Sequence, residues 1–156
     1  MTDFRTRSVT RDIDADPGRV FALITDPRVH PLLDGSGTVH RQLAGPSRLG
    51  AGSRFTMAMR MRVLGVALAY RTTNEVVEFD EGRRIAWRHA GHHVWRYEVA
   101  PNDRGGSQVT ETFAYAQARA PRMLERMGIP ERNEAAMRAS LDRLAEIAER
   151  RTPTSG

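Results

Sequence analysis

The chain has 156 residues, a length typical of one domain, and it can bury a core without a structural metal or disulfide. It contains no cysteine, which excludes disulfides, thiolate catalysis and cysteine-ligated metal sites. The net charge is +5 and all 24 basic residues are arginine, scattered among acidic residues without a block or stripe, so we predict no nucleic-acid partner.

The N-terminal part is predicted to form a strand and two short helices. Alternation of apolar and polar residues predicts the strand from Phe4 to Ile13. A helix then begins with Asp16 as N-cap and Pro17 in the first turn, where its missing N–H costs nothing. It ends before Pro27, because proline disfavours the α conformation of the residue that precedes it. A second helical turn follows at about Arg28–Leu33.

Strands dominate the middle of the chain. The clearest runs from Ser53 to Val63, where apolar residues alternate with polar or small ones and so predict one buried and one solvated face. A phase change near Val76 and Val77 predicts a β-bulge. The predicted strands cover about residues 38–43, 53–63, 68–79, 83–89, 93–100 and 108–116.

The C-terminal part is predicted to be helical. A short helix at Pro121–Met127 is interrupted at Gly128, and a longer helix begins near Pro130 and ends near Arg150. Its apolar residues recur at helical spacing, which predicts one buried face: Met137, Leu141, Leu144 and Ala148.

This order of elements predicts an α+β fold. Consecutive strands with short connections form an antiparallel meander of about six to seven strands. The only long amphipathic element that can cover the sheet is the C-terminal helix. A curved sheet wrapped round one helix leaves a hollow, and the two short helices after the first strand seal one end. We expect one domain over residues 1–151 and a disordered tail over 152–156.

The chain is also predicted to be cytoplasmic. No apolar run approaches the roughly 20 residues that span a bilayer. The start of the chain is polar and lacks the apolar segment of a secretory signal. We therefore expect no membrane insertion.

Several short patterns resemble a known family. They are the Asp16-Pro17 helix start, the Asp26-Pro27 helix stop, the strand Arg84-Ile85-Ala86-Trp87 and the strand Val109-Thr110-Glu111-Thr112-Phe113. Together with the element order, they resemble the polyketide cyclase/dehydrase branch of the START-like (SRPBCC, helix-grip, Bet v 1-like) superfamily over about residues 5–150. The segment 30–37 is similar to one in actinobacterial members, so we expect a bacterial protein.

The resemblance implies a deep hydrophobic cavity between the sheet and the C-terminal helix. Members of the superfamily include lipid and hormone carriers, aromatase/cyclases and many proteins without an assigned activity. The resemblance implies no shared catalytic residue, so candidate residues for this chain come from its own strand pattern.

The residues on the predicted inner faces are the candidate cavity lining. Methionines can adapt to irregular ligands, and aromatic rings offer flat faces for an aromatic guest. The alternative is that these side chains fill a solid core. The predicted lining is Phe55, Met57, Met59, Met61, Tyr70, Ile85, Trp87, Trp95, Tyr97, Val99, Phe113, Met137 and Leu141.

Glu111 and His89 are the candidate catalytic residues, and both are also predicted ligand-binding residues. A carboxylate in an apolar pocket has a raised pKa and can serve as a general acid or base. We favour the alternatives that the last strand has the opposite phase or that an arginine pairs with Glu111. For His89, whose pKa is ordinarily near neutral, we favour a hydrogen-bonded residue of the wall.

His30, Leu33 and Asp34 are predicted to lie at the cavity mouth. We favour a local role for two of them, in which Asp34 forms the turn before Gly35 and His30 caps nearby backbone. The pair His92-His93 has no carboxylate cluster nearby, so we predict no metal site and treat both histidines as solvated. We expect no cofactor.

The predicted function is to bind a small hydrophobic or aromatic molecule in the cavity, as a carrier or sensor and as a monomer or homodimer. The alternative is a polyketide aromatase/cyclase-type enzyme with Glu111 or His89 as its acid or base. An outward Glu111 favours the carrier, whereas either residue on the cavity wall beside a tyrosine hydroxyl favours the enzyme. A partner-binding role of the arginine-rich outer face has little support from the even spread of charge.

Overall fold

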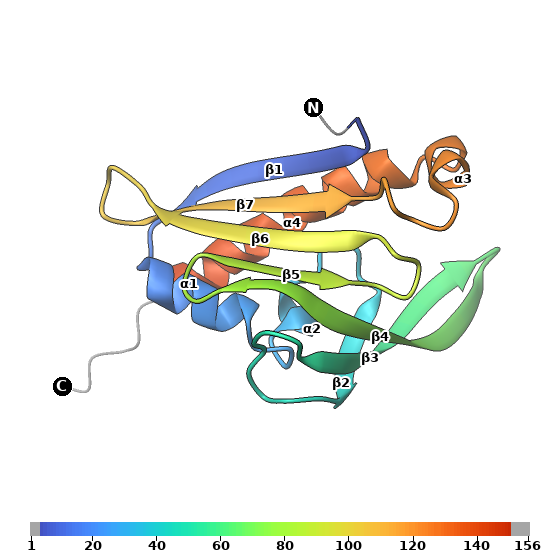
Figure 1. The fold of residues 1–156 in the computed structure, drawn as a ribbon, viewed down its shortest axis with the longest axis horizontal. Helices are drawn as coiled ribbons and strands as arrows, with labels where there is room; N and C mark the ends of the chain where they lie inside the picture. The colour runs from blue at the N-terminus through green and yellow to red at the C-terminus, as the bar shows by residue number, and fades with distance from the viewer. Residues whose placement is uncertain (1–3, 151–156) are drawn as a thin grey trace.

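A seven-stranded antiparallel sheet lies against a long C-terminal helix in the computed structural model, which describes residues 4–150 (Figure 1). The spatial order of the strands is β1-β7-β6-β5-β4-β3-β2. The predicted helix-grip architecture is confirmed, while the predicted tail at 152–156 lies outside the described residues. The elements are β1 (Thr6–Ile13), α1 (Pro17–Ile24), α2 (His30–Leu33), β2 (Val39–Ala44), β3 (Arg54–Val63), β4 (Val66–Asp80), β5 (Arg84–Arg88), β6 (Val94–Pro101), β7 (Ser107–Ala114), α3 (Pro121–Arg126) and α4 (Ile129–Glu149).

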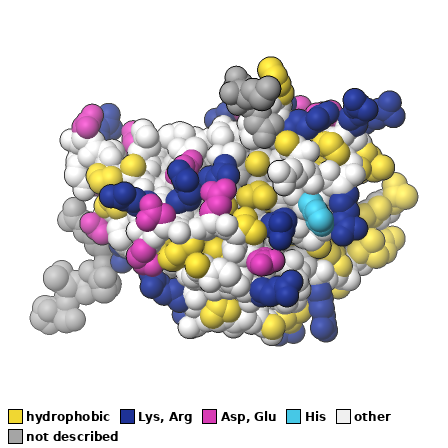
Figure 2. All heavy atoms as spheres, viewed as in Figure 1, with side chains coloured by type: hydrophobic (Ala, Val, Ile, Leu, Met, Phe, Trp, Pro, Cys, Tyr) yellow, Lys and Arg dark blue, Asp and Glu magenta, His cyan; other side chains and the backbone are white. Residues whose placement is uncertain are grey.

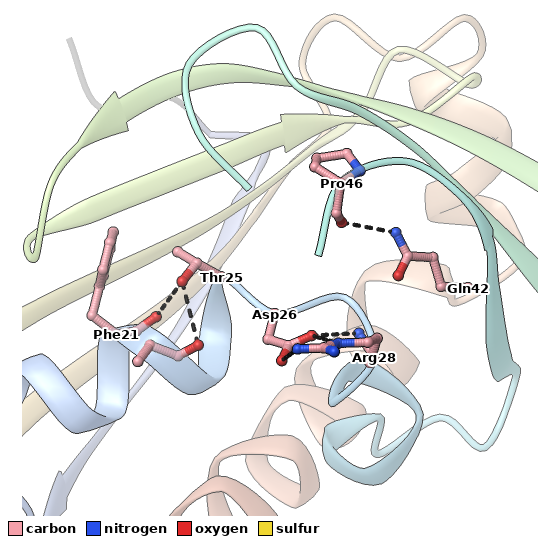
Figure 3. A network of polar contacts seen from close by, with 7 residues as sticks. Phe21, Thr25, Asp26, Arg28, Gln42 and Pro46 are labelled. Carbon is pink, nitrogen blue, oxygen red and sulfur yellow. Dashed lines mark hydrogen bonds and ion pairs between the residues drawn. The ribbon is translucent and has the colours of Figure 1, made fainter. Parts of the chain in front are cut away.

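Local hydrogen bonds set the ends of α1. The Asp16 carboxylate accepts from the backbone N–H of Gly18 at 2.8 Å, which confirms the predicted N-cap. At the other end, the Thr25 hydroxyl donates to the carbonyl of Phe21 at 2.9 Å (Figure 3). The Asp26 carboxylate then accepts from the backbone N–H and the guanidinium of Arg28 at 2.9 Å and 2.7 Å. This compact turn directs the chain into α2 and so positions His30.

The loop after β2 is closed in a similar way. The side-chain amide of Gln42 donates to the carbonyl of Pro46 at 3.0 Å, as Figure 3 also shows. Leu49, at the end of the same loop, is buried and its N–H donates to the carbonyl of Thr25 at 2.8 Å. The loop thereby ties β2 to the end of α1.

Helix α4 covers only part of the sheet. It packs mainly on β1 and β7, while α1 packs on β6 and α2 lies between α4 and β2. The buried face of α4 includes Met137, Leu141 and Leu144, as its helical spacing predicts. The inner face of β3, β4 and β5 is therefore left without a helix directly on it, and a hollow remains there.

The predicted irregularity in the fourth strand is present. The register between β4 and β5 shifts between Val76 and Glu78, which confirms the bulge. The bulge bends β4, so its first half extends with β3 beyond the rest of the sheet as a hairpin (Figure 1). Phe55 and Met57 at the base of β3 are buried, but Met61 and Val63 near its end are exposed. The inner face of β3 is thus buried over only part of its length.

No helix among residues 4–150 is long and apolar enough to cross a membrane.

Candidate functional site

A cavity of about 630 Å³ lies between the inner face of the sheet, α2 and the first half of α4. Strands β3 to β7 all contribute to its wall, and the side chains are mainly aromatic or methionine with a few polar groups. The predicted residues that line it are Phe55, Met57, Met59, Met61, Tyr70, Trp87, His89, Trp95, Tyr97, Glu111 and Met137 from the wall and His30, Leu33 and Asp34 from the predicted mouth.

Four residues of the predicted lining lie elsewhere. Ile85, Val99, Phe113 and Leu141 are each less than 5 % exposed and belong to the hydrophobic core, not to the cavity wall. The strand pattern gives their inward orientation correctly. However, α1 and α4 pack over this half of the sheet, so their side chains are covered by helix. For these four residues, the solid-core alternative holds.

Other cavity residues were not predicted from the sequence. Thr72 and Asn74 continue the alternation that begins at Tyr70, and they face Met57 and Phe55 across the β3–β4 pair. The same period of two could have identified them, although polar residues do not signal a lining. The full set is Ile24, Gly35, Ser36, Thr38, Val39, Thr72, Asn74, His93, Arg132, Asn133, Ala135, Ala136 and Ser140.

Glu111 lies on the cavity wall and pairs with a tyrosine. The hydroxyl of Tyr97, the residue directly opposite on β6, donates to Oε1 of Glu111 at 2.8 Å. Oε2 is buried and has no hydrogen-bond partner among the described residues. The favoured sequence interpretation is therefore wrong, because the Glu111 side chain points into the cavity and no arginine among residues 4–150 forms an ion pair with it.

Burial determines the charge of this carboxyl group. It raises the pKa of Glu111 to about 8, although the hydrogen bond from Tyr97 acts in the opposite direction. Burial also raises the pKa of Tyr97 well above its ordinary value. At pH 7, Glu111 is therefore mainly a neutral acid, which can donate a proton or a hydrogen bond through its unpaired oxygen.

A cluster of aromatic rings forms the wall next to this acid. The rings of Trp87 and Tyr97 have centroids 5.6 Å apart, and Phe55 meets Trp87 edge-on at 5.6 Å. His30 stacks on Trp87 at 5.2 Å, with its Nε2–H donating to the carbonyl of Ile24 at 2.8 Å. Burial lowers the pKa of His30, so the stacked imidazole is neutral near pH 7. Its predicted role as a local cap is confirmed, and it lines the cavity as well.

His89 and His93 form a second aromatic pair on the wall. Their rings stack with centroids 4.5 Å apart, and Nδ1 of His89 accepts from the N–H of Gly91 at 3.2 Å. The prediction of a hydrogen-bonded wall residue is thus confirmed for His89. The prediction that His93 is solvated is wrong, because it packs on Phe113 and burial lowers its pKa to about 4. His92 is exposed, as predicted.

Hydrogen bonds in the turn that follows α2 stabilise the mouth of the cavity. The Asp34 carboxylate accepts from the N–H of Ser36 at 3.0 Å and from the N–H of Val39 at 2.8 Å, which confirms its predicted role in the turn. The N–H of Gly35 donates to the Ser140 hydroxyl at 2.9 Å and so attaches the turn to α4. Residues 4–150 contain no group of three or more His, Asp or Glu side chains that could hold a metal ion.

The sequence matches a family model along nearly its whole length. The model describes "polyketide cyclase / dehydrase and lipid transport" proteins, and the match covers residues 5–149. The chain belongs to this family. The uncharacterized protein Rv0088 from Mycobacterium tuberculosis is 34 % identical in an alignment 151 residues long, and the match covers 86 % of this chain and 66 % of that protein. The chain thus spans just under two thirds of the length of this relative.

Solved structures show the same fold at low sequence identity. Protein CV1439 from Chromobacterium violaceum has a TM-score of 0.70 and 21 % identity, over 94 % of this chain and 99 % of that one. Protein Ms6760 from Mycobacterium smegmatis has a TM-score of 0.69 and 19 % identity, over 94 % and 92 % of the two chains. For this polyketide cyclase/dehydrase family member, family and fold together point to a ligand-binding helix-grip domain. The particular ligand depends on its own cavity side chains.

Proposed function

We propose that this chain binds a small, largely aromatic or apolar molecule in the cavity between the sheet and α4. The observation that supports this most directly is the composition of one wall, where stacked rings adjoin a single buried acid. A cavity of about 630 Å³ lies within the range of roughly 300–1,000 Å³ that small-molecule sites occupy. An apolar wall with a few polar groups is what orients such a ligand.

The acid gives the ligand a preferred orientation. A neutral Glu111 donates through Oε2, so it suits a carbonyl or hydroxyl oxygen at one end of the guest. Thr72 and Asn74 are buried beside the same wall and have no side-chain hydrogen bond to another described residue. A ligand with a flat apolar body against Trp87 and one oxygen atom at Glu111 would match both the aromatic rings and the acid of this wall.

Native mass spectrometry of freshly purified protein tests the proposal directly. We expect a small hydrophobic molecule to co-purify with the chain and to be released when the protein is denatured. Protein that carries no such molecule and also fails to bind any apolar aromatic probe would contradict the proposal.

The contribution of the aromatic wall is measurable with the neutral fluorescent dye phenylnaphthylamine. Replacing Trp87→Leu removes the ring that stacks on His30 and packs at a tilt against Tyr97, and aromatic contacts of this kind contribute about 0.5–1.5 kcal/mol. We therefore expect the dye affinity, measured by fluorescence titration, to fall by about threefold to tenfold. Phe21→Leu is the matched control, because Phe21 is buried in the core away from the cavity. Equal dye affinity of wild type and Trp87→Leu would show that the dye does not bind against the aromatic wall.

A second candidate function is acid catalysis in the same cavity, as in an aromatase/cyclase. The contact between Glu111 and the Tyr97 hydroxyl on the cavity wall is the arrangement that favours an enzyme. A neutral carboxyl group can protonate a carbonyl or departing hydroxyl oxygen during cyclisation and loss of water.

Turnover of a linear poly-β-ketone distinguishes the two functions. For an enzyme, we expect Glu111→Gln to lower kcat by about a hundredfold or more, because glutamine keeps the shape but cannot give up a proton. Dye affinity should change little in the same variant. Full turnover by Glu111→Gln would remove this residue from catalysis and leave binding as the function.

A further inference from the structure

The hairpin formed by β3 and β4 carries an exposed apolar face. Its residues pair across the two strands, Met61 with Leu68 and Val63 with Val66, so they lie on one side of the hairpin. Figure 2 shows hydrophobic side chains gathered at this end of the molecule, beside basic ones. We call this set the apolar hairpin face: Met61 (39 % exposed), Val63 (42 %), Leu64 (99 %), Val66 (61 %), Leu68 (47 %) and Tyr70 (38 %). A contiguous apolar surface of this kind usually marks an interaction site.

Leu64 at the tip is poorly suited to its own conformation. Leu64 and Gly65 are the central residues of the turn and both have positive φ, 50° and 81°. Such turns favour asparagine and glycine, and a branched apolar residue in the left-handed region is unfavourable. Leu64 is also almost fully exposed, so folding gains nothing from burying it. The leucine contributes to neither the turn nor the core of the described chain.

The opposite side of the hairpin is basic. Arg60, Arg62 and Arg71 alternate with the apolar hairpin face, and none of them has an ion pair among residues 4–150. From Gly35 to Asn74 the sequence has six arginines and no acidic residue. The charge is therefore less evenly spread than the sequence predicts, because the acid-free segment contains all of β3 and the part of β4 up to Asn74.

We infer that this hairpin docks the chain on an anionic membrane surface. Apolar side chains at the tip would enter the boundary between headgroups and acyl chains, and the arginines would meet lipid phosphates. Met61 and Tyr70 belong to both the apolar hairpin face and the cavity wall, so docking would bring the cavity close to the lipid. The docking is peripheral, and it is independent of the proposed ligand and of any catalysis.

Charge favours a membrane over two other occupants. A symmetric contact between the hairpins of two copies would bring their arginines together without an acidic residue from either 35–74 segment. A nucleic acid would use the arginines but would leave Leu64 and its apolar neighbours in water. Of these three occupants, only an anionic lipid surface offers acyl chains to the apolar hairpin face and phosphates to the arginines.

Vesicle flotation of the purified chain tests this inference. We expect binding to vesicles of phosphatidylcholine with phosphatidylglycerol, and at least tenfold weaker binding to phosphatidylcholine alone, since each arginine near an anionic surface contributes about fivefold. Added salt should weaken the binding because it screens the arginines. No binding to the anionic vesicles at low salt would overturn the inference.

Leu64→Asn separates docking from folding, because its two expected effects have opposite signs. Asparagine tolerates positive φ, so the melting temperature should stay the same or rise. Vesicle affinity should fall about tenfold or more, because the apolar tip is lost. Val77→Asn is the matched control, since Val77 is 41 % exposed on a different part of β4. Unchanged vesicle affinity of Leu64→Asn would contradict the inference.

The double variant Arg60→Gln/Arg62→Gln tests the basic side. It should lose most of the preference for phosphatidylglycerol, whereas Arg104→Gln, in the turn before β7, should keep it. Two results would overturn the inference in favour of another occupant. One is a dimer, seen by light scattering, that Leu64→Asn dissociates. The other is saturable binding of duplex DNA that Arg60→Gln/Arg62→Gln abolishes and Leu64→Asn leaves intact.

Discussion

Above pH 6.5, wild-type protein is expected to lose stability as the pH rises, and the Glu111→Gln variant is expected to lose much less. The carboxyl group of Glu111 has a pKa of about 8 in the folded chain against an ordinary 4.5. Between these two values, the folded state holds a proton that the unfolded state has released. The free energy of unfolding therefore falls with rising pH, by up to about 1.4 kcal/mol per pH unit for one such group.

The comparison is most informative between pH 6.5 and pH 8. Burial lowers the pKa values of His30, His89 and His93, so these side chains reduce stability only as the pH falls below their ordinary 6.5. Wild type and Glu111→Gln contain the same histidines, so the histidine contribution cancels in the difference between their free energies of unfolding. We expect wild type to lose about 1.5–2 kcal/mol relative to Glu111→Gln over this window.

Urea unfolding at several pH values measures the difference. Glu146→Gln, an exposed change on α4, is the matched control and should keep the wild-type slope. Tyr97→Phe removes the hydrogen bond that lowers the pKa of Glu111, so its loss of stability should extend to higher pH than in wild type. Parallel curves for wild type and Glu111→Gln would show that the carboxyl group is not buried as described.

The sequence predicts which side of each strand faces inward better than it predicts what covers that side. The alternation in β3 correctly orients Phe55 and Met57, and the alternation in β7 correctly orients Phe113. Yet Met57 lines the cavity and Phe113 lies in the core. The difference arises from where α1 and α4 pack on the sheet, which depends on tertiary contacts that no strand period contains.

The partner of Glu111 was beyond sequence reasoning for a related reason. Tyr97 is its partner because β6 and β7 pair in a register that places the two residues directly opposite. Hydrophobic alternation leaves that register free to shift in steps of two residues. His93 is different, since it precedes Trp95 and Tyr97 with the same period and could have been assigned to the inner face.

Gly35→Ala is expected to destabilise the chain by about 3 kcal/mol, because Gly35 lies directly against α4. A Cβ atom at this position would lie 2.2 Å from the carbonyl oxygen of Ala136 and 2.8 Å from the backbone nitrogen of Ser140. Both atoms belong to the helix backbone and cannot move aside as a flexible side chain can. The turn would have to leave α4 and give up the hydrogen bond from Gly35 to the Ser140 hydroxyl.

Gly50→Ala is the matched control, because a Cβ there meets no atom within 4 Å and the backbone φ is not positive. It should leave stability unchanged or raise it by about 0.4–1 kcal/mol. Ser140→Ala removes only the hydrogen bond and should cost about 1 kcal/mol, so urea unfolding of the three variants separates steric contact from hydrogen bonding. Gly35, Ala136 and Ser140 all line the cavity, so Gly35→Ala should also weaken dye binding. If Gly35→Ala were as stable as Gly50→Ala, the turn would not rest on α4, and the mouth of the cavity would be wider than described.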